Sequence, residues 1–550
     1  MSIYSACRFA PCPFLTTSPP SYESDPTALG LVQDTSMSSS PSVQSATASL
    51  RSDHSLEARA EHANHMEKQA ESPAAAATKQ EEDVNHKAFL VDWDGTDDPE
   101  NPLNWSTARK HGITLTLSFA VVVVTFASSV YSSASSAVAK QFGVPGEVGK
   151  LGITLFLCGY AIGPLAWGPL SERQGRKPPM LISYLGFVLF SLATATAKDL
   201  QTVLICRFFG GVFGCGPLSI AGGAMADYSS LEQRGIAIAI YSFATFAGPT
   251  FGPILGSFIV ESHLSWRWTE YLTAIVGFAF LLVLLVALPE TYAKRILQKR
   301  AERRRLETRQ WAWHAQLDEE AFDARVVVTK FLTRPIVMLV IEPMILLLSI
   351  YVAFIYGILY LLFGSLPVHY VEVRGWSEGV GSLPFLALLV GCGLGCLVMV
   401  GFNPRYVHMC KLNNCQPVPE ERLLPMIVGA VVFPVGCMWY AWTTYASVHW
   451  IVPTLALVPI GCGIILLFLQ ALNYLIDAYL AYANSALAAN SLLRSLFGAG
   501  FPLFGTQMMV NLGLQWANTV IGLIGVALLP IPILFYIYGK RLRRSSKFAT

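Results

Sequence analysis

The chain has 550 residues and a formal net charge of +2, from 38 basic and 36 acidic side chains. Charged residues make up 13% of it, against about 25% in soluble proteins, and hydrophobic residues make up 53%. This excludes an ordinary water-soluble enzyme, because there is too little charge to cover a globule of this size, and the balanced charge gives no sign of nucleic-acid binding. The apolar surface is expected to face a lipid bilayer.

Residues 1–88 are predicted to form a disordered tail. The first 52 residues contain 13 serines, and no sustained apolar periodicity follows them. Residues 89–110 are a polar segment before the first membrane span.

Stretches without charge predict the architecture, because about 20 residues of helix cross the hydrocarbon layer. Six such stretches predict a six-helix bundle over residues 111–290, and a basic linker follows at 291–334. In the second half, two windows of 54 and 45 residues are too long for one span each, and we split them near 444–450 and 511–516. This gives a second six-helix bundle over residues 335–539. The predicted fold class is an all-α integral membrane protein with twelve transmembrane helices. The charge-free windows are 111–139, 151–171, 178–197, 208–226, 236–260, 271–289, 343–371, 379–404, 423–476 and 495–539.

The distribution of Lys and Arg predicts that both termini are cytoplasmic. The linker carries 11 basic against 6 acidic residues between 292 and 334, and the tail at 540–550 is basic without an acid. The linker has two interpretations, a surface helix attracted to anionic lipid head groups or a solvated basic connection.

Most cysteines fall inside apolar stretches, so no disulfide framework is expected. Cys410 and Cys415 share a polar loop with His408, which is too few ligands for a metal site. No metal or cofactor is predicted.

The loop after the second span reads GPLSERQGRK at residues 168–177. It resembles the G-x-L-x-D-R-x-G-R-K signature of the major facilitator superfamily, with Glu172 where Asp is usual. The resemblance implies a cytoplasmic gate in which Glu172 meets Arg176 and the N-terminal end of span 11 in one conformation only. The alternative is an ordinary charged turn. The gate residues are Gly168, Leu170, Glu172, Arg173, Gly175, Arg176 and Lys177.

Span 5 contains the sequence GPTFGP at residues 248–253, and Gly256 follows. This is similar to the G-P-x-x-G signature of proton-driven antiporters in that superfamily, although Ala244 and Pro253 stand where glycines are common. The resemblance implies a seal against proton leak, and the alternative is generic helix packing. The motif residues are Gly248, Pro249, Gly252, Pro253 and Gly256.

Three ionisable residues fall within the predicted membrane, and each costs about 2.5 to 3.5 kcal/mol at mid-depth on insertion scales. Arg207 resembles the span-4 arginine that the family associates with proton transfer, and its alternative is a structural interhelical bond. Glu342 is expected to be the only carboxylate well inside a span and to carry a proton, unless it is a helix-end carboxylate paired with Arg334 or bonded near Pro343. Arg494 is a candidate anion or carbonyl contact or a gate residue.

Span 1 has no carboxylate, where many drug:proton antiporters of the superfamily carry one. Asp227 and Asp477, at the cytoplasmic ends of spans 4 and 10, are therefore further proton-coupling candidates. The alternative for both is a helix cap or loop contact.

Further short motifs are similar to the twelve-span fungal drug:proton antiporter family, over roughly residues 90–550. Its members export drugs, polyamines or fungal toxins, so the resemblance implies a transporter without naming its cargo. The motifs stand at 98–105, 265–268, 289–292, 342–343, 374–376 and 474–485.

A substrate cavity is expected at mid-membrane between the two bundles. Aromatic and neutral polar side chains of spans 7, 10 and 11 are suited to binding flat amphipathic molecules. The alternative role of these side chains is packing against other helices or contact with lipid. Few acidic side chains are expected to face the cavity, which argues against a polycation such as a polyamine as the substrate, because it would need several carboxylates. The cavity candidates are Tyr351, Tyr356, Tyr360, Gln470, Asn473, Asn490 and Arg494.

The sequence thus predicts a proton-coupled exporter of small amphipathic organic compounds, either xenobiotics or a secondary metabolite or toxin. Its predicted partners are the substrate, protons and lipid, and it is expected to be a monomer in the plasma membrane or, alternatively, the vacuolar membrane. The alternatives are a polyamine exporter or nutrient importer of the same fold, and more distantly a membrane sensor without transport. An enzyme is not predicted, because the histidines are scattered singly.

Overall fold

The computed structural model describes residues 89–319, 333–414, 416–546 and 548. The expected disordered tail at 1–88 lies outside the described residues, and so do residues 320–332 of the linker.

The stretch assigned to the first bundle holds six long helices, which pack mainly on one another, α3 along α7 and α4 along α6. Local sequence sets their ends. Ser106 caps the first helix by accepting from the Arg109 N–H, and Gly143 ends it with a left-handed φ of 65°. The helices are α3 (Thr107–Phe142), α4 (Gly146–Gln174), α5 (Lys177–Thr196), α6 (Leu200–Tyr228), α7 (Leu231–Glu261) and α8 (Arg267–Ala287).

The second half forms another packed group, in which α13 lies along α18 and α16 along α17. Its two long apolar windows break at residues 444–450 and at Gly513, so both predicted divisions are confirmed. Its helices are α12 (Arg334–Ile341), α13 (Pro343–Pro367), η3 (Val368–Val373), α14 (Glu378–Ser382), α15 (Phe385–Leu412), η4 (Pro419–Arg422), α16 (Leu423–Thr443), α17 (Ile451–Ala478), η5 (Leu480–Tyr482), α18 (Ala483–Leu512), α19 (Leu514–Leu528) and α20 (Pro530–Ser545).

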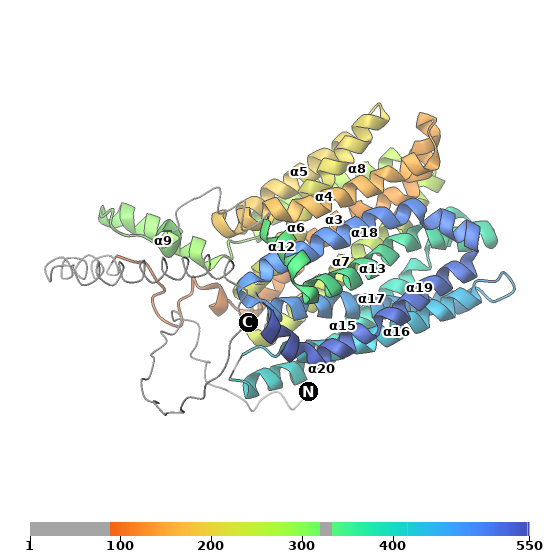
Figure 1. Cartoon of the computed structure of the whole chain (residues 1–550). Helices are drawn as coiled ribbons and strands as arrows, with labels where there is room; N and C mark the ends of the chain where they lie inside the picture. Colours follow the sequence, from red (N-terminus) through yellow and green to blue (C-terminus); the bar gives the residue numbers. More distant parts are fainter. Residues whose placement is uncertain (1–88, 320–332, 415, 547, 549–550) are drawn as a thin grey trace, which may run out of the picture. The chain divides into compact units, whose positions relative to one another are not determined.

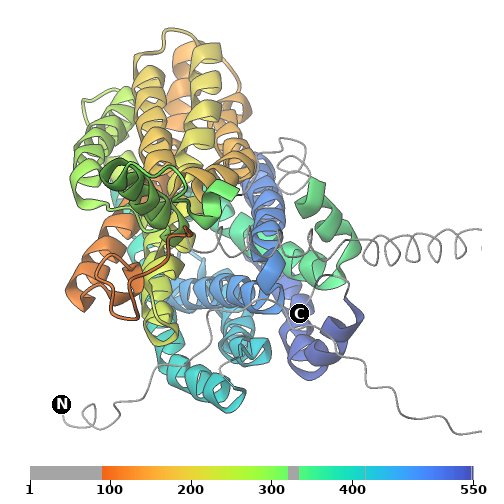
Figure 2. The ribbon, with the colours of Figure 1, turned by 90° about the vertical axis from the view of Figure 1, so that its left-hand side faces the viewer.

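Eleven helical segments in the described part of the chain are long and apolar enough to cross a membrane. They do not include α18, which carries Asn484, Asn490 and Arg494, yet α18 packs lengthwise against α13 and α4 among them. With α18, the predicted twelve-helix membrane fold is confirmed. Figure 1 shows these helices running side by side, and Figure 2 shows them turned by 90°, with orange and yellow helices of the first group next to blue helices of the second.

The two groups meet where α4 lies against α18 and α7 against α15. We call the end of the helices that carries residues 168–177 the gate-loop face, and the end that carries the turn at 143–145 the opposite face. Each span runs from one face to the other.

Between the two groups, the chain forms α9 (Ala293–Thr308) and α10 (Gln316–Glu319). Residues 91–104, which include η1 (Pro102–Asn104), lie against α9, and we call them the strap. The Val91 N–H donates to the His314 carbonyl at 2.8 Å, and Val91 packs with Ala301 and Ala315. The strap and α9 thus form one structure at the gate-loop face.

Candidate functional site

A cavity of about 440 Å³ lies between the two helix groups, and we call it the vestibule. It is lined by α3, α4 and α7 from the first group and by α13 and α18 from the second. Because Lys140 near the end of α3 and Gly146 at the start of α4 are among its lining residues, the vestibule belongs to the opposite face. Serines of α3 give it a polar wall.

The floor of the vestibule is closed by a contact between the two groups. The Tyr360 hydroxyl of α13 lies 2.8 Å from the Ser128 hydroxyl of α3. Tyr356 lies one turn deeper, with its hydroxyl 3.4 Å from that of Tyr360, and Tyr351 is buried nearer the gate-loop end of α13. Of the three tyrosines, Tyr360 lines the vestibule.

Arg494 lies below this floor on α18. Its guanidinium carbon lies 5.3 Å from the centre of the Tyr356 ring and 5.1 Å from that of Phe468, and Nη2 donates to the Ser491 hydroxyl at 3.3 Å. Asn490, one turn earlier, donates to the Ser349 hydroxyl at 3.3 Å. The other two polar candidates, Gln470 and Asn473 of α17, are buried.

The gate loop turns sharply at Gly175, whose φ is 89°. Arg176 then folds back, so that Nε lies 2.9 Å from Asp227 Oδ2 and Nη1 donates to the Ser171 hydroxyl at 2.9 Å. Burial alone would lower the pKa of Arg176, but the Asp227 carboxylate outweighs it and the pKa is raised. The backbone N–H of Arg176 donates to Glu290 Oε1 at 2.7 Å, which ties the loop to the end of α8.

Glu172 joins the two groups at the gate-loop face. Its Oε1 accepts a hydrogen bond from Asn484 Nδ2, in the first turn of α18. The sequence predicted a contact of Glu172 with Arg176 as well, but Arg176 pairs with Asp227. Of the other gate residues, Lys177 donates from Nζ to the Leu285 carbonyl at 3.0 Å, Leu170 is half-buried against the core, and Gly168 and Arg173 lie in the last turns of α4.

The second group repeats the Asp227 arrangement. Asp477, at the end of α17, lies 3.0 Å from Arg422 Nε and accepts from the Tyr406 hydroxyl at 2.8 Å. Asp227 and Asp477 are therefore both ion-paired at the gate-loop ends of their helices.

The G-P-x-x-G motif of α7 faces α3. A Cβ at Gly248 would lie 2.0 Å from Thr125 Oγ1, and one at Gly252 would lie 1.9 Å from Ser129 Oγ. Pro249 and Pro253 lie inside the helix, Gly256 approaches α3 one turn later, and the Ser133 hydroxyl donates to the Pro253 carbonyl at 3.2 Å. These glycines allow the closest approach of the two helices.

Arg207 lies inside the first group with a carboxylate that the sequence analysis missed. Its Nη1 lies 3.2 Å from Glu270 Oε1 of α8, and the side chains of both residues are 2% exposed or less. Arg207 also donates to the Ala127 and Gly152 carbonyls at 2.9 and 3.2 Å. Glu270 was missed because it follows Arg267 at the start of span 6, where a boundary charge is expected. A search for a counter-ion to Arg207 would have found it.

Glu342 occupies a different place from the predicted one. It lies at the break between α12 and α13, just before Pro343, and its Oε2 accepts from the Tyr479 hydroxyl at 3.0 Å and the Ser546 hydroxyl at 2.6 Å. Glu342 is therefore a helix-end carboxylate near Pro343, as its alternative interpretation has it, and it is not the only buried carboxylate, because Glu270 in the first turn of α8 is buried as well.

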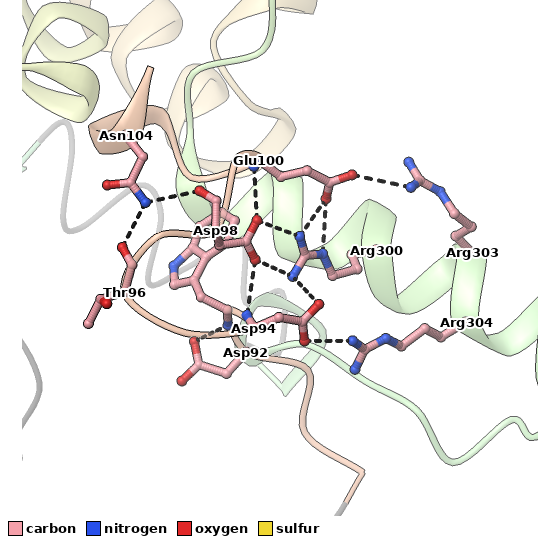
Figure 3. Close-up of polar contacts among 10 residues, drawn as sticks. Asp92, Asp94, Thr96, Asp98, Glu100, Asn104, Arg300, Arg303 and Arg304 are labelled. Atoms are coloured by element: carbon pink, nitrogen blue, oxygen red, sulfur yellow. Dashed lines mark hydrogen bonds and ion pairs between the residues drawn. The ribbon is translucent and has the colours of Figure 1, made fainter. Parts of the chain in front are cut away.

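The strap is held to α9 by a network of ion pairs, of which Arg300–Asp98 is the most buried. Arg300 binds Asp98 at 2.7 Å, Asp94 at 3.3 Å and Glu100 at 2.8 Å, and Figure 3 shows the three carboxylates converging on its guanidinium. Arg303 and Arg304 pair with Glu100 and Asp94. The Arg300 side chain holds the pKa of Asp98 well below its usual range. Three linker arginines are thus neutralised within the protein, which weakens the lipid-binding interpretation of the linker.

In the part of the chain that the structure describes, no three His, Cys, Asp or Glu side chains gather as a metal site requires. Cys410 is buried with a free thiol, and Cys415 lies outside the described residues.

A family model described as the Major Facilitator Superfamily matches residues 117–502. The chain is 47% identical over 462 residues to the citrinin biosynthesis cluster MFS transporter mrr1 of Monascus ruber, which covers 84% of this chain and 92% of that protein. It is 45% identical over 462 residues to the ascochitine biosynthesis cluster MFS transporter of Didymella fabae, covering 84% and 89%.

Two solved structures share the fold. The proton:xylose symporter XylE has a TM-score of 0.58 at 15% identity, over 79% of this chain and 96% of that one. The human organic anion transporter MFSD10 has a TM-score of 0.54 at 15% identity, over 78% and 99%. The matched family model spans more than half of the sequence, and the relatives are fungal transporters. The chain therefore belongs to the major facilitator superfamily of membrane transporters.

Proposed function

We propose that this protein is a proton-coupled exporter of small amphipathic organic compounds, in particular secondary metabolites or xenobiotics. The observation that carries the proposal is the vestibule, which lies between the two helix groups while the Glu172–Asn484 contact closes the gate-loop face. The names of two relatives place them in citrinin and ascochitine biosynthesis clusters, which supports a secondary metabolite as cargo.

The basic loops favour a cytoplasmic gate-loop face with both termini on that side. In that orientation the vestibule belongs to the non-cytoplasmic face, so the structure corresponds to the state in which an exporter releases its substrate. Opening of the gate-loop face would require the Glu172–Asn484 contact to break, and closure of the vestibule would follow as the two groups rock. We place the protein in the plasma membrane as a monomer, with the vacuolar membrane as the alternative.

Proton coupling is assigned first to the Arg207–Glu270 pair. A buried carboxylate beside a buried guanidinium has two distinct states, ion-paired when ionised and hydrogen-bonded when neutral, so that a proton can change the packing of α6 against α8. Asp227, Asp477 and Glu342 remain secondary candidates, because each lies near the gate-loop face with several partners. The protein carries out no covalent chemistry in this proposal.

The test is uptake into inside-out vesicles with an acidic interior, measured with citrinin, rhodamine 6G and spermidine. An exporter accumulates citrinin or rhodamine 6G in these vesicles, and the uptake disappears when a protonophore removes the pH difference. Accumulation of spermidine alone would favour a polyamine exporter, and uptake driven only by an acidic bath would favour an importer. A protein that reaches the membrane but moves none of these compounds would contradict the proposal and favour the sensor.

A further inference from the structure

We infer that the region around Arg494 binds an organic anion, so that the exported compound carries a carboxylate or an equivalent acidic group next to an aromatic ring system. This inference rests on the proposed export function and adds the chemical class of its substrate. Its basis is a half-buried positive charge that has no carboxylate beside it in the described part of the chain.

The first step is the pairing of charges within the two helix groups and at their gate-loop ends. Arg207 has Glu270 as its counter-ion, and Arg176 and Arg422 have Asp227 and Asp477. Among the residues that the structure describes, no carboxylate lies within 4.0 Å of the Arg494 guanidinium, which contacts two aromatic rings and one hydroxyl. Arg494 therefore adds a net positive charge to the interior.

The second step is depth. Arg494 stands 11 residues after the start of the 30-residue helix α18, which is about 16 Å along the helix at 1.5 Å per residue and well inside its length. A cation at this depth costs about 2.5 to 3.5 kcal/mol on insertion scales. Such a residue is retained where it serves a function, and an anionic ligand would supply the missing charge.

The third step concerns what holds Arg494 without substrate. The faces of Tyr356 and Phe468 are the main contacts, and Nε is buried without a hydrogen-bond partner. A cation–π contact contributes about 0.5 to 2 kcal/mol, whereas a carboxylate binds the guanidinium fork through two charge-assisted hydrogen bonds. A ligand carboxylate can therefore compete for Arg494, and the two released rings can stack on its aromatic part.

A second unpartnered polar atom lies on the same face of α18. The Oδ1 atom of Asn490 is buried with no hydrogen-bond partner, and Asn490 is one turn from Arg494, so both side chains point toward α13. An unsatisfied acceptor beside an unsatisfied cation suits a ligand that has a hydroxyl as well as an acidic group.

The position on α18 also fits a substrate site. Figure 1 shows α18 between α4 and α13, and contacts to α4 flank Arg494 on both sides. Asn484 binds Glu172 toward the gate-loop face, and the Ala499 carbonyl accepts from the Thr154 hydroxyl at 2.8 Å toward the opposite face. Arg494 thus lies between two contacts that join the two groups, below the floor that Tyr360 and Ser128 form.

The vestibule itself does not select for charge. It is lined by Lys140 and Lys150 and also by Glu372 and Glu378. Selection between anions and cations is therefore expected at Arg494, and a cationic compound would be repelled there.

The test uses three probes with one ring system and different charge: 1-naphthoate, 1-naphthamide and 1-(aminomethyl)naphthalene. Their dissociation constants are measured with the purified full-length protein in nanodiscs, without a pH difference. We expect naphthoate to bind wild-type protein at least about tenfold more tightly than naphthamide, as a charge-assisted bond in a desolvated site implies. Arg494→Gln should remove this preference. Arg405→Gln is the matched control, because Arg405 is an exposed arginine of α15.

The inference is overturned if wild-type protein binds naphthoate and naphthamide with equal affinity, or if it binds the amine most tightly. It is also overturned if the preference for naphthoate over naphthamide survives Arg494→Gln. Absence of naphthoate binding at millimolar concentration would overturn it as well. If Arg494→Gln does not fold, Arg494→Lys decides, since it keeps the charge but loses the planar fork and should weaken naphthoate while leaving naphthamide unchanged. If the protein prefers naphthoate but shows no proton-driven flux, only the proposed function is overturned. If it shows proton-driven flux but no preference for naphthoate, only this inference is overturned.

Discussion

The guanidinium of Arg207 and the carboxylate of Glu270 lie 3.2 Å apart inside the first helix group, where neither side chain is more than 2% exposed. They stand 63 residues apart in the chain, on α6 and α8. Tyr131 and Phe156 contact the guanidinium carbon with their rings, whose centres lie 4.7 and 4.3 Å away. The energetics of this pair give the first prediction.

Loss of either partner should destabilise the protein, because it leaves an unpaired charge in the interior. We expect Arg207→Met to lower the free energy of unfolding by about 3 to 5 kcal/mol, and Glu270→Gln to lower it less, since a glutamine still accepts the arginine hydrogen bond. The double variant Arg207→Met/Glu270→Leu should regain stability without regaining proton-driven uptake. Thermal unfolding in detergent and vesicle uptake give the two readouts. Normal proton-driven uptake by the double variant would show that the pair is only structural.

The Glu172–Asn484 contact should matter for the conformational equilibrium more than for folding. Either Glu172→Ala or Asn484→Ala removes a charge-assisted hydrogen bond that holds the gate-loop face closed. We therefore expect each variant to react faster with a thiol reagent added on the gate-loop side, when a cysteine replaces Ser491. We also expect each to reduce uptake at least about tenfold. The two effects should not add in the double variant, because both substitutions remove one interaction. Additive effects, or unchanged labelling, would show that the contact does not hold the gate.

The strap should detach from α9 in acid. Arg300 lowers the pKa of Asp98 in the folded state, below the unfolded value of about 3.9, so this carboxylate stabilises the docked strap at neutral pH. The stabilisation is lost as the pH falls from about 4 through the lower folded-state pKa.

Asp98→Asn should detach the strap already at neutral pH. Distances between spin labels at Thr96 and Glu307 would report this as a broadened distribution. Asp97→Asn is the control, because Asp97 is exposed and the neighbouring Asp98 is the residue that Arg300 binds. A narrow distribution in Asp98→Asn would show that the apolar contacts of Val91 hold the strap without the ion pairs.

The contact of α7 with α3 should not tolerate a larger residue at Gly252. An added Cβ would lie 1.9 Å from Ser129 Oγ and 2.7 Å from the Val130 backbone nitrogen. We expect Gly252→Ala to cost about 1 to 3 kcal/mol through overpacking, and Ser129→Gly to recover part of this. Gly222→Ala in α6 is the control, since nothing lies within 4 Å of its added Cβ. Equal melting temperatures of the two variants would show that the helices separate freely.

The sequence by itself determined the number of the spans and their approximate positions. The long apolar windows divide at 444–450 and at Gly513 as expected, because hydrophobic length, interfacial residues and a backbone turn are local properties that any twelve-span arrangement must satisfy. The family signature at 248–256 also marked a place where two helices approach closely, and the one at 168–177 marked a sharp turn at Gly175.

Only the tertiary structure decided the partners of the charged residues. Glu270 pairs with Arg207, Asp227 pairs with Arg176, which had been expected to meet Glu172, and Glu342 lies at a helix break. Each outcome depends on how a helix is rotated about its axis and which distant helix it meets, and a single sequence contains no signal for either. The same reason applies to Arg494: its place in a span could be read from the chain, but the lack of a carboxylate opposite it is a property of the packed helices.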